Sequence, residues 1–142
     1  MDTKKFKMLD QKWGPHTYDR FASPYNRKCE NFSAKFWCEG CAGINSLSES
    51  WLGENNWVVP PPVMITTVLN KIIKEKAHIT LIVPVWKSAP YWPLICQKDN
   101  FITEVYDNVY FSGNNFTHKG RGKNGIFGKR IQNFMFVALR FI

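Results

Sequence analysis

The residues best suited to bind a charged ligand lie in a basic, glycine-rich segment near the carboxyl end, KGRGKNGIFGKR. Four glycines let the backbone approach a ligand closely, and the flanking cations can neutralise phosphates. These cations are Lys119, Arg121, Lys123, Lys129 and Arg130. The segment lacks the spacing of a nucleotide-binding P-loop and the strand-to-helix setting of a dinucleotide fingerprint. It predicts a loop that contacts phosphates, with a solvated basic loop between strands as the alternative.

The overall charge favours the same kind of partner. The formal net charge is +8, and no acidic residue follows Asp107. A second group of cations lies at the amino end, at Lys4, Lys5, Lys7 and Lys12. Because lysine and arginine bind phosphates through charge and counterion release, nucleic acid is the expected partner. A basic surface that serves only to keep the protein in solution explains the composition equally well.

The cysteines could support a different chemistry. Cys38 and Cys41 form a C-x-x-C pair, and Cys29 lies nine residues upstream of Cys38. A tetrahedral zinc site would have to recruit His16 or Cys96 as well. We expect free thiols and no metal, with a structural zinc-binding module as the alternative.

Residues 55–85 predict the strands and the helix that would position the candidate binding residues. A strand at 57–59 is followed by Pro60, a helix at 63–76 with apolar residues at helical spacing, and an apolar strand at 79–85. This order predicts a parallel βαβ unit. A short strand at 16–18 would bring Asp19 close to the proline turn, where open α/β sheets hold ligands. Asp19 and Arg20 then either face a ligand together or form a local salt bridge in a turn.

The rest of the chain fits one α/β domain, of Rossmann-like type with a mostly parallel sheet, over residues 1–142. Residues 134–142 predict a last buried strand, and residues 1–12 a basic lead that need not be ordered. An aromatic cluster at Trp86, Tyr91 and Trp92 either stacks on bases or caps the core. The amino terminus does not resemble a signal peptide and no run spans a bilayer, so we expect an intracellular protein without membrane contact.

The order of several motifs resembles a region of the polyproteins of DIRS-type, tyrosine-recombinase retrotransposons. The resemblance covers about residues 12–141 and rests on WGPHTYDRFASPYNRK, FSAKFW, GCAGIN, SWLGENNWVVPP, LIVPVWKSAPYWPL and GRGKNGIFG. It implies a polyprotein region between the reverse transcriptase with RNase H and the recombinase. Other retroelement polyprotein domains would then be partners.

A more distant resemblance links DRFAS and the proline turn to phage-type adenine-N6 DNA methyltransferases, which use S-adenosylmethionine. Their signature after a strand is Asn or Asp, two prolines and an aromatic residue; here it reads Val59, Pro60, Pro61 and Pro62. Valine cannot accept a hydrogen bond from the adenine amino group, and proline offers no ring on which a flipped base can stack. The resemblance implies that Asp19 lies near the cofactor and that the catalytic residues are missing.

These observations favour a catalytically degenerate, methyltransferase-like domain of retrotransposon origin with a nucleic-acid-binding or scaffolding role. No cofactor is expected, although S-adenosylmethionine stays open as a ligand. The alternatives are an active adenine-N6 DNA methyltransferase and the structural zinc module. Hydrolase chemistry is disfavoured, because the sequence has neither a G-x-S-x-G turn nor a cluster of acidic residues for two metals.

Overall fold

The computed structural model describes residues 3–21, 28–29, 31–34, 43–44, 46–112 and 135–142. The helices are α1 (Thr3–Trp13), α2 (Ile65–Glu75) and α3 (Trp92–Ile95), with 3-10 turns η1 (Ser46–Ser48) and η2 (Pro62–Met64). The strands are β1 (Tyr18–Asp19), β2 (Asn31–Ala34), β3 (Gly43–Ile44), β4 (Asn55–Val58), β5 (His78–Pro84), β6 (Cys96–Gln97), β7 (Asn100–Phe101), β8 (Asp107–Ser112) and β9 (Met135–Phe141). This mixture of elements confirms the α/β class. In this described part, no helix is long and apolar enough to cross a membrane.

The main sheet has the strand order β3-β2-β1-β4-β5-β9-β8 over the described residues. Neighbouring strands from β3 to β5 are parallel. β9 is antiparallel to both β5 and β8, so β8 points the same way as β5. The prediction of a mostly parallel sheet therefore holds from β3 to β5 and fails at β9, which makes the sheet mixed. The apolar sequence of β9 indicated burial, but burial does not fix the direction of a strand.

Strand direction defines two edges of the sheet. We call the edge where β1, β4, β5 and β8 end the carboxyl edge, and the opposite one the amino edge. β9 begins at the carboxyl edge, since it runs against its neighbours.

Residues 55–85 form the predicted βαβ unit. β4 and β5 pair in parallel from Asn55↔His78 to Val58↔Leu81, and α2 connects them. The helix begins at Ile65 because η2, which starts at a proline, forms the first tight turn. It ends at Lys76, whose φ of 56° is left-handed. β4 starts two residues earlier than predicted, which places Asn55 and Asn56 within the strand.

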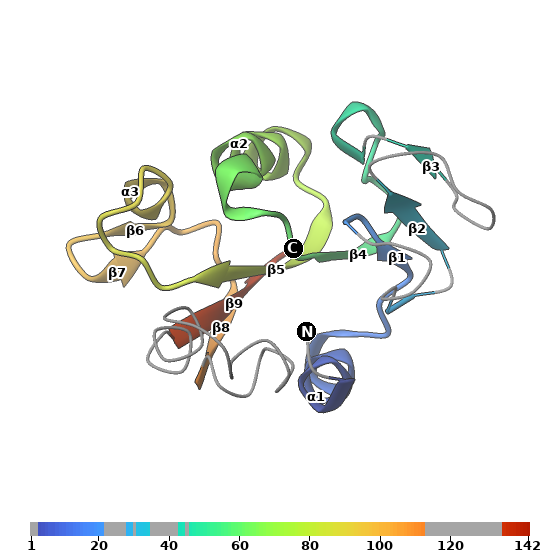
Figure 1. Cartoon of the computed structure of the whole chain (residues 1–142), viewed down its shortest axis with the longest axis horizontal. Helices are drawn as coiled ribbons and strands as arrows, with labels where there is room; N and C mark the ends of the chain where they lie inside the picture. The colour runs from blue at the N-terminus through green and yellow to red at the C-terminus, as the bar shows by residue number, and fades with distance from the viewer. Residues whose placement is uncertain (1–2, 22–27, 30, 35–42, 45, 113–134) are drawn as a thin grey trace, which may run out of the picture.

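Helices α1 and α2 lie on opposite faces of the sheet (Figure 1), and buried side chains form one apolar cluster on each face. The α2 face carries the larger apolar cluster, which includes Trp51, Val58, Leu69, Leu81 and Leu139. The α1 face carries a smaller one, which includes Leu9, Trp13, Cys29, Trp57, Ile82, Phe111 and Ala138. Alternation along each strand produces this division, since successive side chains point to opposite faces.

α1 corrects the expectation of a basic lead at residues 1–12. From Thr3 onward the chain is helical, and Leu9 and Trp13 are buried. The ring of Phe6 meets that of Trp57 edge-on at a centroid distance of 4.7 Å. The lysines suggested an unordered lead because their charge obscured the apolar spacing of Phe6, Leu9 and Trp13.

The aromatic cluster after β5 belongs mainly to the core. Tyr91 and Trp92 are 3% and 8% exposed. Tyr91 Oη donates a hydrogen bond to the carbonyl oxygen of Pro84 at 2.6 Å, and Trp92 packs against Phe101. Because these rings are buried, they favour the interpretation that the cluster caps the core over the interpretation that it stacks on nucleic-acid bases.

Candidate functional site

The strand order places a topological switch point between β1 and β4. After β1 the chain moves outward to β2 and β3, then returns to β4 on the other side of β1. In open α/β sheets ligands bind at such a switch point, at the carboxyl ends of the strands. Asp19 pairs with Trp57, and the Arg20 amide donates to the Trp57 carbonyl at 3.0 Å. The predicted closeness of Asp19 to the proline turn is thus confirmed, while its role toward a cofactor stays a prediction.

The Asp19 carboxyl is already engaged by the chain. It is 3% exposed. Oδ2 accepts a hydrogen bond from the Lys28 amide at 2.9 Å and Oδ1 one from the Phe21 amide at 3.3 Å. Burial raises the pKa of Asp19 to about 6, although both hydrogen bonds act to lower it. Asp19 therefore fastens residues 21 and 28 to the end of β1.

The proline turn follows β4 at the same switch point. Val59 is half-buried and packs against the α1-face cluster. Pro60 is buried, whereas Pro61 and Pro62 are exposed. Val59 thus occupies the position that the methyltransferase resemblance gives to a hydrogen-bond acceptor, and it acts as a packing residue.

Arg20 lies on the opposite face of the sheet from Asp19. Its Nε donates to Asn56 Oδ1 at 2.7 Å, and its guanidinium carbon lies 3.5 Å from the centroid of the Tyr18 ring. Its ion-pair partner is Glu49, at 3.7 Å between Nη1 and Oε1. The interpretation of a local salt bridge between Asp19 and Arg20 is therefore wrong, because each side chain has partners of its own, whereas contact with a ligand stays a prediction.

Asn56 is a positioning residue that sequence reasoning missed. It is 0% exposed, and Nδ2 lies 2.9 Å from the Trp51 carbonyl and 3.0 Å from the His78 carbonyl. With Arg20 it ties the segment before β4 to the sheet. The available signal was a polar residue directly before the apolar run WVV, and it was missed because the strand was predicted to begin at residue 57.

A chain of buried polar side chains lies on the α1 face near the amino edge. His16 Nδ1 is 2.7 Å from Asp10 Oδ1, and Nε2 is 2.6 Å from Thr80 Oγ1. Arg140 Nη1 donates to Thr80 Oγ1 at 3.0 Å and to Asn55 Oδ1 at 2.7 Å. Carboxylate, imidazole and hydroxyl follow in the order of a nucleophilic triad. Thr80 is 0% exposed, so its hydroxyl cannot reach a substrate and the network is structural.

Hydrogen-bonding capacity fixes the protons in this network. A carboxylate oxygen accepts, so in the neutral ring Nδ1 donates to Asp10 and Nε2 accepts the Thr80 hydroxyl hydrogen, while the Thr80 oxygen accepts from Arg140. His16 then carries its proton on Nδ1 and donates it to Asp10. This arrangement needs a neutral imidazole. Burial lowers the pKa of His16, against the raising influence of Asp10, and so favours that form.

Gly14 lets the chain turn from α1 into the network. Its amide donates to the Asp10 carbonyl at 2.8 Å, and the His16 amide donates to Asp10 Oδ1 at 2.7 Å. A Cβ atom at position 14 would lie 2.3 Å from the Asp10 carbonyl oxygen and 2.5 Å from Oδ1. Any other residue would displace Asp10.

The described cysteines give no support to a zinc site. Cys29 is buried and free, and Cys96 is free and half-buried. Burial raises the pKa of the Cys29 thiol to about 12, which disfavours the thiolate that zinc requires. Cys38 and Cys41 lie outside the described residues. Among the residues that are described, no group of three or more His, Cys, Asp or Glu could hold a metal.

The basic glycine-rich segment also lies outside the described residues, and with it Lys119, Arg121, Lys123, Lys129 and Arg130. Its flanking strands are described. Ser112 ends β8 and Met135 begins β9, and these two residues are paired. Both ends of the intervening segment therefore meet the sheet at the carboxyl edge, where Asp19 and Pro60 also lie.

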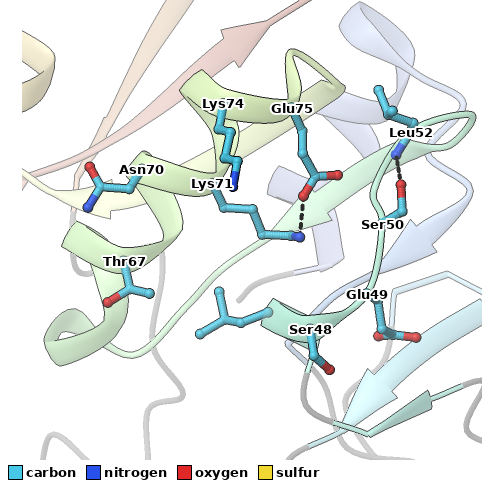
Figure 2. A pocket seen from close by; sticks show the side chains of 10 residues that line it. Ser48, Glu49, Ser50, Leu52, Thr67, Asn70, Lys71, Lys74 and Glu75 are labelled. Carbon is cyan, nitrogen blue, oxygen red and sulfur yellow. Dashed lines mark hydrogen bonds and ion pairs between the residues drawn. The ribbon is translucent and has the colours of Figure 1, made fainter.

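A groove runs between α2 and the segment before β4 (Figure 2). Lys71 and Glu75 form an ion pair on its wall, and Glu75 Oε1 also accepts a hydrogen bond from the Trp51 amide at 2.9 Å. Glu49 is paired with Arg20. Of these groups, Glu75 joins the two walls through the Trp51 amide, while Lys71 and Glu49 are held in ion pairs.

Comparison with known proteins does not assign the chain to a family. No protein-family model matches the sequence, and no curated protein matches it either.

Proposed function

We propose that the chain is a catalytically degenerate, methyltransferase-like domain of DIRS-type retrotransposon origin that binds nucleic acid at the carboxyl edge of its sheet. The strand order β3-β2-β1-β4-β5 supports a Rossmann-like origin, since doubly wound nucleotide-binding sheets have the order 3-2-1-4-5-6. β9, which is antiparallel to β5, departs from the parallel order of such sheets.

The loss of catalysis is supported by the residue at the acceptor position that the resemblance assigns, which is Val59. Val59 packs into the α1-face cluster. Transfer to an adenine amino group needs an acceptor that turns the nitrogen lone pair toward the methyl donor. A valine side chain, here half-buried against that cluster, has no acceptor atom, and Pro62 cannot stack on a flipped base.

The described residues do not fit S-adenosylmethionine either. The resemblance assigns a carboxylate near the cofactor to Asp19. That carboxyl is buried, accepts hydrogen bonds from two amides and has a raised pKa, so it has little capacity left for a ligand. We therefore assign no step to the cofactor.

Charge supports nucleic acid as the partner. The net charge is +8, and the five cations between Lys119 and Arg130 lie in a segment whose two ends meet the carboxyl edge. A scaffolding role within a polyprotein is the second candidate, and it predicts no affinity for nucleic acid.

Methyl transfer and oligonucleotide binding test the proposal on the purified full chain. With labelled S-adenosylmethionine and DNA, we expect no transfer of label. With fluorescent single-stranded and duplex oligonucleotides, we expect binding that weakens as salt increases. Methylation by the unmodified chain would favour the active enzyme, and a chain that binds no oligonucleotide would favour the scaffold.

A triple variant tests the basic segment itself. Changing Arg121, Lys123 and Arg130 to alanine should lower the slope of log K against log salt by about two to three, because each lost phosphate contact removes about 0.7 on single strands or about 0.9 on duplex. The variant should keep the circular dichroism spectrum of the parent. An unchanged slope in this folded variant would assign the segment to solubility.

A further inference from the structure

β8 is the last strand in the order of the main sheet, among the strands that the structure describes. Its inner edge pairs with β9, from Asp107↔Arg140 to Ser112↔Met135. An outermost strand presents a row of backbone groups that can pair with a strand of another chain. The residues of β8 therefore bear on whether its outer edge attracts such a strand.

The hydrogen bonds of β9 show which backbone groups of β8 point outward. The Val85 amide donates to the Met135 carbonyl at 2.8 Å, so Met135 turns its backbone groups toward β5. The next residue along β9 then faces β8, where it pairs with Phe111. Because these directions alternate along an antiparallel strand, Phe111 and every second residue before it turn toward β9. Asn108 and Tyr110 therefore turn their amide and carbonyl groups to the outer edge.

The sequence of β8, DNVYFS, suits strand pairing. Valine, tyrosine and phenylalanine are strong strand formers, and β8 contains neither lysine nor proline, two residues that commonly protect an edge. Tyr110 is 49% exposed, and Tyr106, just before the strand, is 67% exposed. The composition of this edge thus favours pairing with another chain.

One side chain of β8 caps an outward-pointing backbone group. Asp107 Oδ1 accepts a hydrogen bond from the Asn108 amide at 2.8 Å. Asp107 Oδ2 accepts one from Trp13 Nε1 at 3.2 Å and lies 3.6 Å from Lys12 Nζ, so α1 holds the carboxyl in this orientation. An incoming strand must displace the bond to the Asn108 amide. Its carbonyl oxygen would also approach a carboxylate, and neither group can donate a hydrogen bond to the other.

We propose that Asp107 blocks the outer edge of β8 against pairing with a second copy of this chain. In antiparallel pairing about Val109, the backbone groups of Asn108 in each copy meet those of Tyr110 in the other. Asp107 of one copy then lies opposite Phe111 of the other, so no two carboxylates are brought together. The edge is thus complementary to itself once the Asp107 side chain is removed. This inference does not depend on the proposed binding of nucleic acid.

A second copy is the partner that this edge favours. Twofold pairs are the commonest protein oligomers, and both copies contribute the same patch. The net charge of +8 opposes association in general, but β8 has no charged residue after Asp107, so cations of the strand itself do not meet at the contact. Self-association is therefore the quantity to measure.

Removal of the Asp107 side chain tests the proposal on the purified full chain. The side chain is 39% exposed, so Asp107→Ala should leave the fold intact while it uncaps the Asn108 amide. Lys12→Gln is the matched control, because it removes the ion pair and leaves the cap. Sedimentation velocity over a range of protein concentrations measures association. We expect the parent and Lys12→Gln to stay single chains, and Asp107→Ala to form dimers whose fraction increases with concentration.

A second substitution separates edge pairing from misfolding. Tyr110→Pro removes an amide that points outward, so it costs no bond to β9 but prevents pairing at the edge. Added to Asp107→Ala, it should restore the single chain with the circular dichroism spectrum of the parent. Tyr110→Lys, which places a cation on the edge, is the milder alternative and should act in the same direction.

Three results would refute the proposal. The first is an Asp107→Ala variant that stays a single chain at every concentration, which would mean that the edge does not pair. The second is a dimer that persists in both double variants, which would place the contact elsewhere. The third is a parent that already forms dimers through this edge, shown by their loss in Tyr110→Lys alone.

Discussion

The two faces of the sheet are held by different forces. On the α2 face, Leu69, Leu81 and Leu139 belong to a large apolar cluster and are 0% exposed. On the α1 face, a smaller apolar cluster shares the surface with the hydrogen-bonded network of Asp10, His16, Thr80, Arg140 and Asn55. Apolar burial stabilises in proportion to area, whereas a buried polar network mainly recovers the cost of its own desolvation. The apolar cluster of the α2 face should therefore provide most of the stability. The polar network of the α1 face should determine which arrangement of strands and helices forms.

The largest effect should come from the α2 face. Leu69→Ala should reduce the free energy of unfolding by about 2–5 kcal/mol, because it removes buried methyl groups and leaves a cavity. Urea denaturation measures the loss, with Ile73→Ala as control on the same helix, where the side chain is 37% exposed. Similar losses from the two variants would contradict the assignment of the main core to this face.

The second effect concerns the buried carboxyl on the α1 face. The pKa of Asp19 is raised to about 6 from 3.8, so the folded state holds the proton more tightly than the unfolded state. Its contribution is present below about pH 4 and is lost as pH rises through 6, a change of about 3 kcal/mol.

Asp19→Asn isolates this contribution from the other titrating groups. The stability of the variant relative to the parent should improve between pH 3.5 and pH 7, because asparagine stays neutral. His16 acts in the opposite sense, since its lowered pKa removes stability as pH falls below 6.5. Because both the variant and the parent contain His16, the difference between their stabilities at each pH does not include its contribution. A difference independent of pH would show that Asp19 is not buried as described.

The smallest of the three effects tests the polar network. Thr80→Val keeps the shape of the side chain but leaves His16 Nε2 without its donor and Arg140 without one acceptor. We expect a loss of about 1–3 kcal/mol, typical of a buried group left unsatisfied. Thr67→Val, on the exposed surface of α2, is the matched control. Equal unfolding midpoints for both variants would mean that the network contributes nothing to stability.

Sequence reasoning located the elements with strong local patterns. The spacing of Ile65, Val68, Leu69 and Ile72 identified α2, because a helix that is buried on one side has apolar residues three and four positions apart. The unbroken apolar run at 79–85 identified β5, because a strand that is buried on both faces is apolar throughout. A strand was expected at 16–18, and it lies at Tyr18–Asp19 as β1, which pairs in parallel with β4. The placement of Asp19 at the proline turn was predictable for that reason.

The polar contacts could not be predicted in the same way. His16 and Thr80 are 64 positions apart, and Arg140 reaches Asn55 from a strand whose direction the sequence did not reveal. Such contacts depend on register and on which face each residue occupies, and a shift of one residue reverses the face. α1 was missed because four lysines dominated the composition of a segment with only a few apolar positions.

The position of β9 has a consequence for folding. β9 is the last strand along the chain, yet it lies between β5 and β8 and joins residues as distant as Ile79 and Phe141. Among the described strands, β8 has no neighbour in the main sheet until residues 135–141 are synthesised, and β5 presents an apolar open edge of the kind that pairs with other chains. Contacts between such distant residues also slow the search for the native arrangement. The sheet should therefore close late, and aggregation during synthesis should begin at the edge of β5 that β9 later covers.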